Sequence, residues 1–374
     1  MKIMVVLGTR PEIIRLSRVI NALERDSEVI FIHTEQNYDP GLSNIFFQEL
    51  GVRPPDVYLG IHQQQFGKQI GEILCRSEEQ LIRHRPARLL ILGDTNSGLS
   101  AIVARRLGVP VYHMEAGNRC LDDRVPEEVN RRLIDHVSTI LLPYTHRSKE
   151  NLVAEGIPRD RIFVTGNPIF EVLEHFKEKV DESRILEQLE LDKCGYFLLT
   201  LHRAENVDNL SRLRQLLMGI DLVAEKHEQP IICSLHPRTR QRLQVLGFST
   251  KHERIRFLDP MGFFNFIRLE QNASCVLSDS GTVQEECCIF GVPTVTLRDV
   301  TERPETVECG SNVLSGSDPK DILRAVGIAQ ETRGTWSPPA EYLVRRVSTT
   351  IVKIVTGYHV PDMAELDWRA GAIH

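Results

Sequence analysis

The chain has 374 residues, of which 41% are hydrophobic and 26% are charged, and its formal net charge is −6 at pH 7. A chain of this length usually folds into more than one domain. The negative charge argues against a general nucleic-acid-binding protein, which normally presents a basic surface. No apolar run approaches the roughly 18 residues that span a bilayer, so we expect no membrane-spanning segment.

The cysteines and the N-terminus indicate a cytoplasmic protein. Eight cysteines are scattered along the chain and form no CxxC pair, a distribution typical of reduced thiols. The N-terminal MKIMVVLGTR run passes directly into a charged helical stretch and lacks a small-residue cleavage site. We therefore expect this run to be the first strand of a sheet and not a signal peptide.

Short apolar runs alternate with stretches long enough for crossover helices. Uniformly apolar runs are typical of strands that are buried on both faces of a parallel sheet. The runs are 2–7, 28–33, 88–93, 110–114, 139–143 and 161–165 in the first half, and 196–201, 230–235, 254–258, 275–279, 293–297 and 311–314 in the second. This pattern predicts an α/β protein with two Rossmann-like, doubly wound domains and a ligand cleft between them.

The domain boundary is expected within residues 167–175, after the segment GNPIFEVL. We therefore predict a first domain over residues 1–170 and a second over residues 171–355. Residues 360–374 are polar and irregular, which predicts a frayed tail.

Open parallel sheets bind ligands at the carboxyl ends of their strands, so the residues that follow each run are the candidates for a site. The first run is followed by GTRPE, with Pro11 suited to the first position of a helix. Arg10, and Arg15 further along the same helix, are typical of an anion site at a helix N-terminus. The alternative is an arginine that only pairs with a carboxylate.

Three carboxylates follow runs in the first half. Asp94 comes directly after RLLILG, where it can accept from ligand hydroxyls, hold an arginine or cap a helix. Glu115 ends the 110–114 run, and Glu127 opens the helix that begins at Pro126. Glu115 and Glu127 are candidates for a general acid/base pair. The alternative for Glu127 and for Glu128 is an ordinary acid in the first turn of a helix.

Two histidines end runs in the second half, His202 in LTLHRAEN and His236 in CSLHPRT. An imidazole beside an anionic ligand is the functional interpretation, and an ordinary loop histidine is the alternative. Neither has a partner in an HExxH pattern, and no Asp/Cys cluster supports a metal, so no metal site is predicted.

The strongest local signal is DSGTVQEE after the 275–279 run. The backbone N–H groups of Ser280, Gly281 and Thr282 at the start of a helix form a cradle for phosphate. One turn later Glu286 is placed to accept the hydroxyls of a ribose, with Glu285 packed or capping. Arg303, after the next run, is expected at the phosphate end. The alternative is an ordinary helix start.

Together these motifs resemble the non-hydrolysing UDP-N-acetylglucosamine 2-epimerases, over nearly the whole chain to about residue 355. The segments that carry the resemblance are GTRPEIIRL, GDTNS, HMEAGNRC with RVPEEVNRRLIDH, TGNPIFE, HRAEN, HPRT, and DSGTVQEE followed by GVPTVTLRDVTERPET. The resemblance implies two domains of the glycosyltransferase-B type, with a last helix at about 340–356 returning to the first domain. It also implies interconversion of UDP-GlcNAc and UDP-ManNAc by elimination and re-addition of UDP, without a cofactor, in a homodimer.

The resemblance assigns roles to individual residues. Asp94, Glu115 and Glu127 match the acid/base carboxylates of the family, and His202 matches its histidine near the diphosphate. Arg10, Ser280 and Gly281 match diphosphate positions, and Glu286 matches the acid on the ribose.

The chain also departs from the common pattern. Arg15 stands where the family often has lysine, Thr282 stands where a second glycine is usual, and the segment between Gly117 and Pro126 is short. The NRC and RVPEE segments and Phe170-Glu171-Val172 resemble a branch that forms UDP-N-acetyl-L-fucosamine from a 6-deoxy UDP sugar. The hexosamine therefore stays open between UDP-GlcNAc and the 6-deoxy sugar, and a glycosyltransferase of the same architecture is a further alternative.

Overall fold

The computed structural model describes residues 1–36, 40–63, 65–235, 237–247 and 252–359. Contacts between residues divide the chain into two compact units, one from Met1 to Val172 together with the segment from Val344, and the other from Leu173 to Leu343. The expected tail at 360–374 lies outside the described residues. Among the described residues, no helix is long and apolar enough to cross a membrane.

Unit 1 is built on a parallel sheet with the strand order β3-β2-β1-β4-β5-β6 in the described residues. Its strands are β1 (Lys2–Leu7), β2 (Glu28–His33), β3 (Val57–Tyr58), β4 (Arg88–Leu92), β5 (Val111–Met114) and β6 (Ile140–Leu142). The order reverses between β1 and β4, and such a switch point is where open α/β sheets bind ligands.

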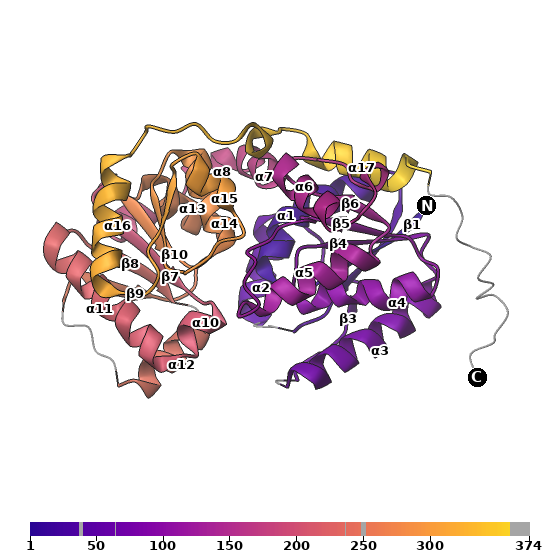
Figure 1. Ribbon diagram of the computed structural model, residues 1–374, viewed down its shortest axis with the longest axis horizontal. Coiled ribbons are helices and arrows are strands. Elements are labelled where there is room, and N and C mark those ends of the chain that lie inside the picture. The colour runs from indigo at the N-terminus through magenta and orange to yellow at the C-terminus, as the bar shows by residue number, and fades with distance from the viewer. Residues whose placement is uncertain (37–39, 64, 236, 248–251, 360–374) are drawn as a thin grey trace. The chain divides into compact units, whose positions relative to one another are not determined.

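The helices of unit 1 cover both faces of this sheet (Figure 1). They are α1 (Arg10–Leu23), α2 (Pro40–Glu49), α3 (Phe66–His84), α4 (Ser100–Arg106), α5 (Pro126–Val137), α6 (His146–Ala154), α7 (Ile169–His175) and α17 (Val347–Gly357), with short 3-10 turns at Asn96–Leu99 and Arg159–Arg161. Helix α17 packs on α1, and Arg88 donates to the carbonyl oxygens of Val355 and Tyr358. The C-terminal helix therefore belongs to unit 1.

Unit 2 repeats the same topology with the order β12-β11-β10-β7-β8-β9. Its strands are β7 (Phe197–Leu201), β8 (Ile231–Leu235), β9 (Ile255–Leu258), β10 (Cys275–Ser278), β11 (Thr294–Thr296) and β12 (Asn312–Leu314). Its helices are α8 (Lys177–Asp181), α9 (Ile185–Gln188), α10 (Ala204–Val207), α11 (Leu210–His227), α12 (Pro237–Val245), α13 (Phe263–Asn272), α14 (Gly281–Phe290), α15 (Pro304–Glu308) and α16 (Pro319–Glu331), with a 3-10 turn at Ala340–Leu343.

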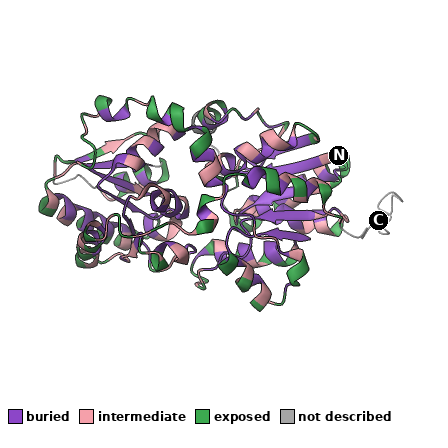
Figure 2. Ribbon diagram, turned by 90° about the horizontal axis from the view of Figure 1, so that it is seen from above, coloured by how far each residue is buried: buried purple, intermediate pink, exposed green. Residues whose placement is uncertain are grey.

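The alternation of side chains along β7 explains why the strands are uniformly apolar. Phe197, Leu199 and Leu201 enter a core cluster with residues of α11 and α16, whereas Leu198 enters a second cluster with residues of α13 and α14. Both faces of the sheet are therefore buried at its central strands, and Figure 2 draws most strand residues of each unit in purple. Burial on both faces removes the need for polar residues on alternate positions.

The predicted strands agree with the structure in eleven of twelve cases, counting each apolar run that overlaps a strand. The run at 161–165 was wrongly expected to be a strand, because only Ile162 forms a bridge, to Leu141. The two-residue strand Val57–Tyr58 was not predicted, because it is too short for a periodic pattern.

Candidate functional site

The carboxyl ends of β4 and β5 carry two candidate carboxylates in backbone that leaves its strand sharply. Gly93, with φ at 73°, ends β4 and precedes Asp94. Glu115 follows β5 with φ at 65°, a left-handed conformation that costs a residue other than glycine roughly 1–2 kcal/mol. An ideal Cβ on Gly93 would lie 3.8 Å from Glu115 Oε2, so the two strand ends present their carboxylates in the same region of unit 1.

Glu115 is held by groups from two other elements. Arg15 Nη1 in α1 donates to Glu115 Oε2 over 2.6 Å, and the Tyr144 hydroxyl donates to the same oxygen over 3.3 Å. The amide of Asn118 donates to Oε1 over 3.3 Å. Arg15 is 2% exposed and Glu115 8% exposed, so this is a buried ion pair. The guanidinium fixes the orientation of the Glu115 carboxylate and balances its charge.

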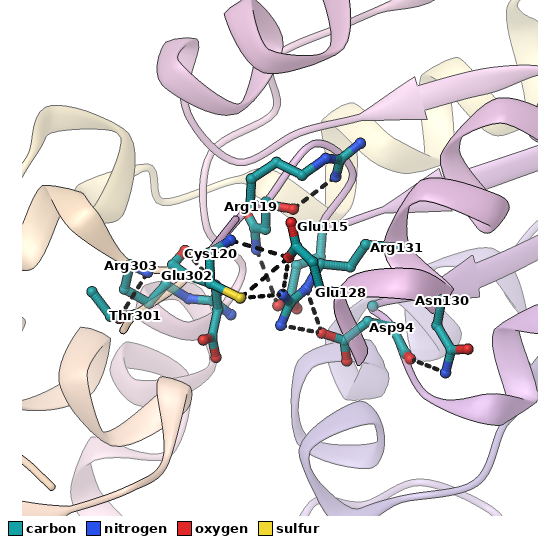
Figure 3. A network of polar contacts seen from close by, with 12 residues as sticks. Asp94, Glu115, Arg119, Cys120, Glu128, Asn130, Arg131, Thr301, Glu302 and Arg303 are labelled. Carbon is teal, nitrogen blue, oxygen red and sulfur yellow. Dashed lines mark hydrogen bonds and ion pairs between the residues drawn. The ribbon is translucent and has the colours of Figure 1, made fainter. Parts of the chain in front are cut away.

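Asp94 is bound by Arg131 of α5 (Figure 3). Arg131 Nε and Nη2 each lie 2.8 Å from Asp94 Oδ2, and Nη1 donates to Glu128 Oε2 over 2.6 Å. Asp94 therefore holds an arginine, which is one of the three roles that the sequence left open for it, and Thr95, not Asp94, occupies the N-cap position of the following 3-10 turn. Asp94 keeps a side-chain exposure of 22%, so part of it remains open to solvent.

Glu128 anchors the segment between Gly117 and Pro126. It is fully buried and accepts from the backbone N–H groups of Cys120 and Leu121 over 3.0 and 3.2 Å. Burial on its own would raise the pKa of Glu128, but these hydrogen bonds and Arg131 outweigh it and hold the pKa below its usual range. Glu127, its neighbour in the first turn of α5, is partly exposed.

A second buried network lies behind the same strand ends. His113 of β5 contacts Asp135 Oδ1 through Nδ1 and the Gly93 carbonyl oxygen through Nε2, both over 2.8 Å. Asp135 Oδ2 accepts from the backbone N–H of Gly117 over 3.1 Å and lies 2.8 Å from Arg119 Nη1. His113 therefore joins the loop that carries Asp94 to the loop that follows Glu115.

Arg10 is the first residue of α1, at the carboxyl end of β1. Its guanidinium lies 5.8 Å from the ring centroid of Phe46, within the range of a cation–π contact. Arg10 is partly exposed, unlike Arg15. Of the two arginines that the sequence proposed for an anion, only Arg10 therefore retains an exposed surface.

In unit 2, His202 lies directly against Asp279 at the neighbouring ends of β7 and β10. His202 Nδ1 is 3.0 Å from Asp279 Oδ1, and the carboxylate also accepts from the backbone N–H groups of His202 and Arg203 and from the Asn206 amide, over 3.0 to 3.1 Å. Burial would raise the pKa of Asp279, but the charge of His202 and these hydrogen bonds lower the pKa to about 2. An ionised Asp279 therefore orients the His202 ring.

The start of α14 has the form that the DSGT motif predicted. Ser280 precedes the helix in extended backbone, and its hydroxyl lies 2.9 Å from that of Thr282. An ideal Cβ on Gly281 would lie 2.6 Å from Glu302 Oε1, so a larger residue would displace that carboxylate. The first N–H groups of a helix have no partner within the helix, which is the arrangement that binds anions.

The two acids of α14 differ in their surroundings. Glu285 is fully buried and forms an ion pair with Arg303, so it is packed, as one of the two predicted readings had it. Glu286 is 4% exposed, and its charge acts on the carboxyl group of Glu270 in α13. Burial, and then the charge of Glu286, raise the pKa of Glu270 well above its usual range.

The segment Thr301-Glu302-Arg303, whose side chains Figure 3 draws, contacts residues of α14. The Thr301 hydroxyl donates to Gln284 Oε1 over 2.7 Å, and Arg303 is 4% exposed beside Glu285. Glu302 is bound by Arg298 over 2.7 Å and by Arg203 over 3.1 Å. These contacts fix the segment that follows β11 next to the helix start.

Several residues of these networks were not predicted to take part. Arg131, Tyr144 and Asp279 each hold a candidate residue in place, although each lies far from its partner in sequence. Asp279 is the last residue of a predicted strand and Tyr144 follows one, which is a signal that could have found them. Predicted His236 lies outside the described residues. In the part of the chain that is described, no group of three or more His, Cys, Asp or Glu side chains could hold a metal ion.

Comparisons with known proteins agree with this arrangement. A family model described as UDP-N-acetylglucosamine 2-epimerase matches residues 21–356. The chain is 43% identical over 347 residues to a UDP-N-acetylglucosamine 2-epimerase of Methanocaldococcus jannaschii, covering 91% of this chain and 95% of that protein. It is 38% identical to a UDP-2,3-diacetamido-2,3-dideoxy-D-glucuronate 2-epimerase of Pseudomonas aeruginosa, covering 85% of this chain and 89% of that protein.

The fold agrees as well. A crystal structure of the M. jannaschii UDP-GlcNAc 2-epimerase in complex with UDP-GlcNAc and UDP has a TM-score of 0.91 at 41% identity and covers 95% of this chain and 99% of that one. The predicted fold class, two Rossmann-like units of the glycosyltransferase-B type, is confirmed. On the family model and on these similarities, the chain belongs to the UDP-N-acetylglucosamine 2-epimerase family.

Proposed function

We propose that this protein is a non-hydrolysing UDP-N-acetylglucosamine 2-epimerase, an isomerase that interconverts UDP-GlcNAc and UDP-ManNAc. The observation that carries the proposal is the pair of carboxylates at adjacent strand ends, Glu115 bound by Arg15 and Asp94 bound by Arg131. In a chain of this family, they are positioned acid/base groups. The M. jannaschii structure described above is a complex with UDP-GlcNAc and UDP, which supports this choice of substrate.

The chemistry explains why carboxylates are needed. The C2 proton of the sugar is not next to a carbonyl, so its removal alone would leave an unstabilised carbanion. In the proposed reaction a carboxylate removes that proton while the bond between C1 and the UDP oxygen breaks. UDP leaves with the bonding electron pair, and a C1–C2 double bond forms in 2-acetamidoglucal. UDP then adds back to C1, and a proton is delivered to C2 on the opposite face.

We assign the acid/base work to Asp94, Glu115 and Glu127. General acid/base groups contribute typically 10²–10⁴-fold when they are correctly placed. The carboxylate of Glu115 is held by three side chains, which fixes its orientation. Arg15 acts in this proposal through Glu115, whereas the partly exposed Arg10 at the start of α1 binds the diphosphate.

Unit 2 binds the nucleotide in this proposal. The N–H groups of Gly281 and Thr282 and the hydroxyl of Ser280 bind the phosphates at the start of α14, since the Ser280 N–H already donates to Ser278 Oγ over 3.0 Å. Glu286 accepts from the ribose hydroxyls. His202, oriented by Asp279, and Arg303 stabilise the negative charge that develops on the leaving UDP. His236 has a predicted role in the same nucleotide site. The expected cleft between the two domains stays a prediction.

We further propose that the protein works in the cytoplasm as a homodimer and needs neither a cofactor nor a metal. The scattered thiols, which are free in the structure, support a reducing compartment. The homodimer is supported by the family resemblance, and light scattering coupled to gel filtration tests it.

A product assay tests the function. Purified protein is incubated with UDP-GlcNAc, and the nucleotide sugars are separated and identified. The proposal predicts UDP-ManNAc as the accumulating product, with UDP and 2-acetamidoglucal as minor species. Free ManNAc in amounts equal to UDP would instead show a hydrolysing epimerase, and transfer to an added acceptor would show a glycosyltransferase.

A substrate panel then decides the sugar. The panel contains UDP-GlcNAc, the 6-deoxy UDP-HexNAc with the talose configuration, and a UDP-2,3-diacetamido uronate, which corresponds to the substrate in the P. aeruginosa relative's name. The proposal predicts the highest kcat/KM for UDP-GlcNAc. Turnover of only one of the other two sugars would support epimerisation at C2 but would show that this sugar, and not UDP-GlcNAc, is the substrate.

A further inference from the structure

We propose that Glu12 is a positioning residue that joins the diphosphate-binding loop after β1 to the acid/base loop after β4. This inference rests on the proposed function, because Arg10 and Asp94 carry those two roles there. Glu12 lies in the first turn of α1, is 2% exposed and takes no part in the proposed reaction itself.

The contacts of Glu12 connect the two loops directly. Its Oε2 accepts from the backbone N–H of Gly8 over 3.1 Å and from the hydroxyl of Thr9 over 2.7 Å. Its Oε1 accepts from the hydroxyl of Thr95 over 3.1 Å. Thr9 immediately precedes Arg10, and Thr95 immediately follows Asp94. One buried carboxyl group therefore sets the backbone next to both functional side chains.

The surrounding packing leaves these loops little freedom. An ideal Cβ on Gly8 would lie 2.2 Å from Thr34 Oγ1 and 2.3 Å from Ser97 Oγ, which are themselves 2.7 Å apart. Thr34 follows β2, and Ser97 lies in the turn after Asp94. The loops after β1, β2 and β4 thus pack closely around Gly8, and Glu12 supplies the hydrogen bonds between the first and the last.

A helix cap alone does not account for this arrangement. An acid at the third position of a helix can reach back to the N–H groups at the helix start, which stabilises the helix. The bond from Thr95 is different, because it comes from a residue 83 positions away on another loop. If Glu12 acted only as a helix cap, loss of the hydrogen bond from Thr95 would leave kcat unchanged.

The hydrogen bonds from Thr9 and from Thr95 to Glu12 can be removed one at a time. Thr95→Val removes the hydroxyl on the Asp94 side at nearly constant volume, and Thr9→Val removes the one on the Arg10 side. We expect Thr95→Val to lower kcat about tenfold or more and to change KM much less, because small displacements of reacting groups are costly. We expect Thr9→Val to raise KM and the Kd for UDP more than it lowers kcat.

Glu12 itself is tested by a pair of variants. Glu12→Gln preserves the contacts, since its oxygen still accepts from Gly8 and Thr9 and its NH₂ donates to the Thr95 hydroxyl. We expect kcat and the Kd for UDP within about threefold of the parent protein, whereas Glu12→Ala changes both by about tenfold or more. Ser138→Ala is the matched control. Its buried hydroxyl donates to the Ile134 carbonyl over 2.7 Å before β6, so the variant lowers Tm and leaves kcat unchanged.

The outcomes separate the inference from the proposed function. The inference is overturned if Thr95→Val and Glu12→Ala fold and keep kcat within twofold of the parent protein. It is also overturned if Glu12→Gln is as impaired as Glu12→Ala, because the carboxylate would then act directly. Absence of epimerisation in the parent protein refutes the proposed function instead. In that case the Kd for UDP of Thr9→Val and Glu12→Ala still tests whether Glu12 positions the loop that carries Arg10. Weaker UDP binding supports this part of the inference, and unchanged binding overturns it.

Discussion

Arg15 Nη1 lies 2.6 Å from Glu115 Oε2, and both side chains are almost completely buried. The pair joins α1 to the end of β5, across 100 positions of sequence. Glu115 has a left-handed backbone conformation, which costs a residue other than glycine free energy and persists only where surrounding contacts hold it. The ion pair therefore holds the carboxylate of the candidate base in a fixed orientation, which is what catalysis by a fixed carboxylate requires.

Removal of this guanidinium should impair both stability and turnover. Arg15→Met leaves Glu115 buried without its cation, which typically costs about 3–5 kcal/mol of unfolding free energy. We expect kcat to fall by about two orders of magnitude, as Glu115 loses its orientation. Urea unfolding and steady-state kinetics measure the two effects. Arg159→Met, which removes an exposed partner of Glu150, is the control and should cost about 0–1 kcal/mol. Equal stability losses in the two variants would contradict the account.

Asp279 should make the protein sensitive to acid. Its pKa is about 2 in the folded protein and 3.8 as a reference, so the ionised carboxylate stabilises the fold above about pH 4. This stabilisation, about 2 kcal/mol, is lost as the pH falls from 4 towards 2. Asp279→Asn should lack that part of the pH dependence and should have a higher KM, because His202 is no longer oriented. Parallel stability curves for the two proteins between pH 4 and 2 would refute the assignment.

Glu12 should make the protein less stable as the pH rises, which is the opposite of the pH dependence expected from Asp279. Burial raises the pKa of Glu12 from 4.5 to about 7, so its contribution to stability is complete below pH 4.5 and is lost as the pH rises towards 7. Glu12→Gln cannot ionise and should be more stable than the parent protein at pH 8, by up to about 3 kcal/mol, while the two are similar at pH 4. Thermal unfolding across this range measures the difference. A constant difference from pH 4 to 8 would contradict it.

The turn after Glu115 should tolerate no side chain at Gly117. Its φ is 80°, and an ideal Cβ would lie 2.2 Å from the Ser148 carbonyl oxygen and 2.8 Å from Leu152 Cγ. Gly117→Ala should therefore cost more than about 2 kcal/mol of unfolding free energy. Gly71→Ala is the control, in the interior of α3 with no atom near the added methyl, and should gain about 0.5–1 kcal/mol. A neutral Gly117→Ala would show that this turn adapts.

The fold could be predicted largely from sequence because its strands are buried on both faces. Uniform apolar runs such as 28–33 and 196–201 can be predicted as strands without knowledge of the strands that pair with them. The run at 161–165 has the same composition but forms only a bridge at Ile162, since pairing depends on the neighbouring strand. Val57 and Tyr58 form a strand through pairing with Ile32 and His33, which no local pattern records.

The candidate site could be predicted only in part, and for a related reason. Asp94, Glu115 and Ser280 follow strands, so the rule for parallel sheets finds them. Arg131 and Arg15, which hold Asp94 and Glu115, are placed by the packing of helices and loops, and the sequence does not state which arginine meets which acid. Glu285 and Glu286 are adjacent in sequence, yet one meets Arg303 and the other Glu270.

The central claim is that a carboxylate of this chain exchanges the C2 proton of a UDP-HexNAc, and exchange in heavy water tests it most directly. The parent protein is incubated with UDP-GlcNAc in ²H₂O, and deuterium at C2 is followed by NMR, beside Glu115→Gln with its UDP affinity measured separately. The account predicts deuterium at C2 of both epimers with the parent protein, and no exchange but nearly unchanged UDP binding with Glu115→Gln. UDP-ManNAc that forms without deuterium at C2, or full exchange by Glu115→Gln, would contradict it.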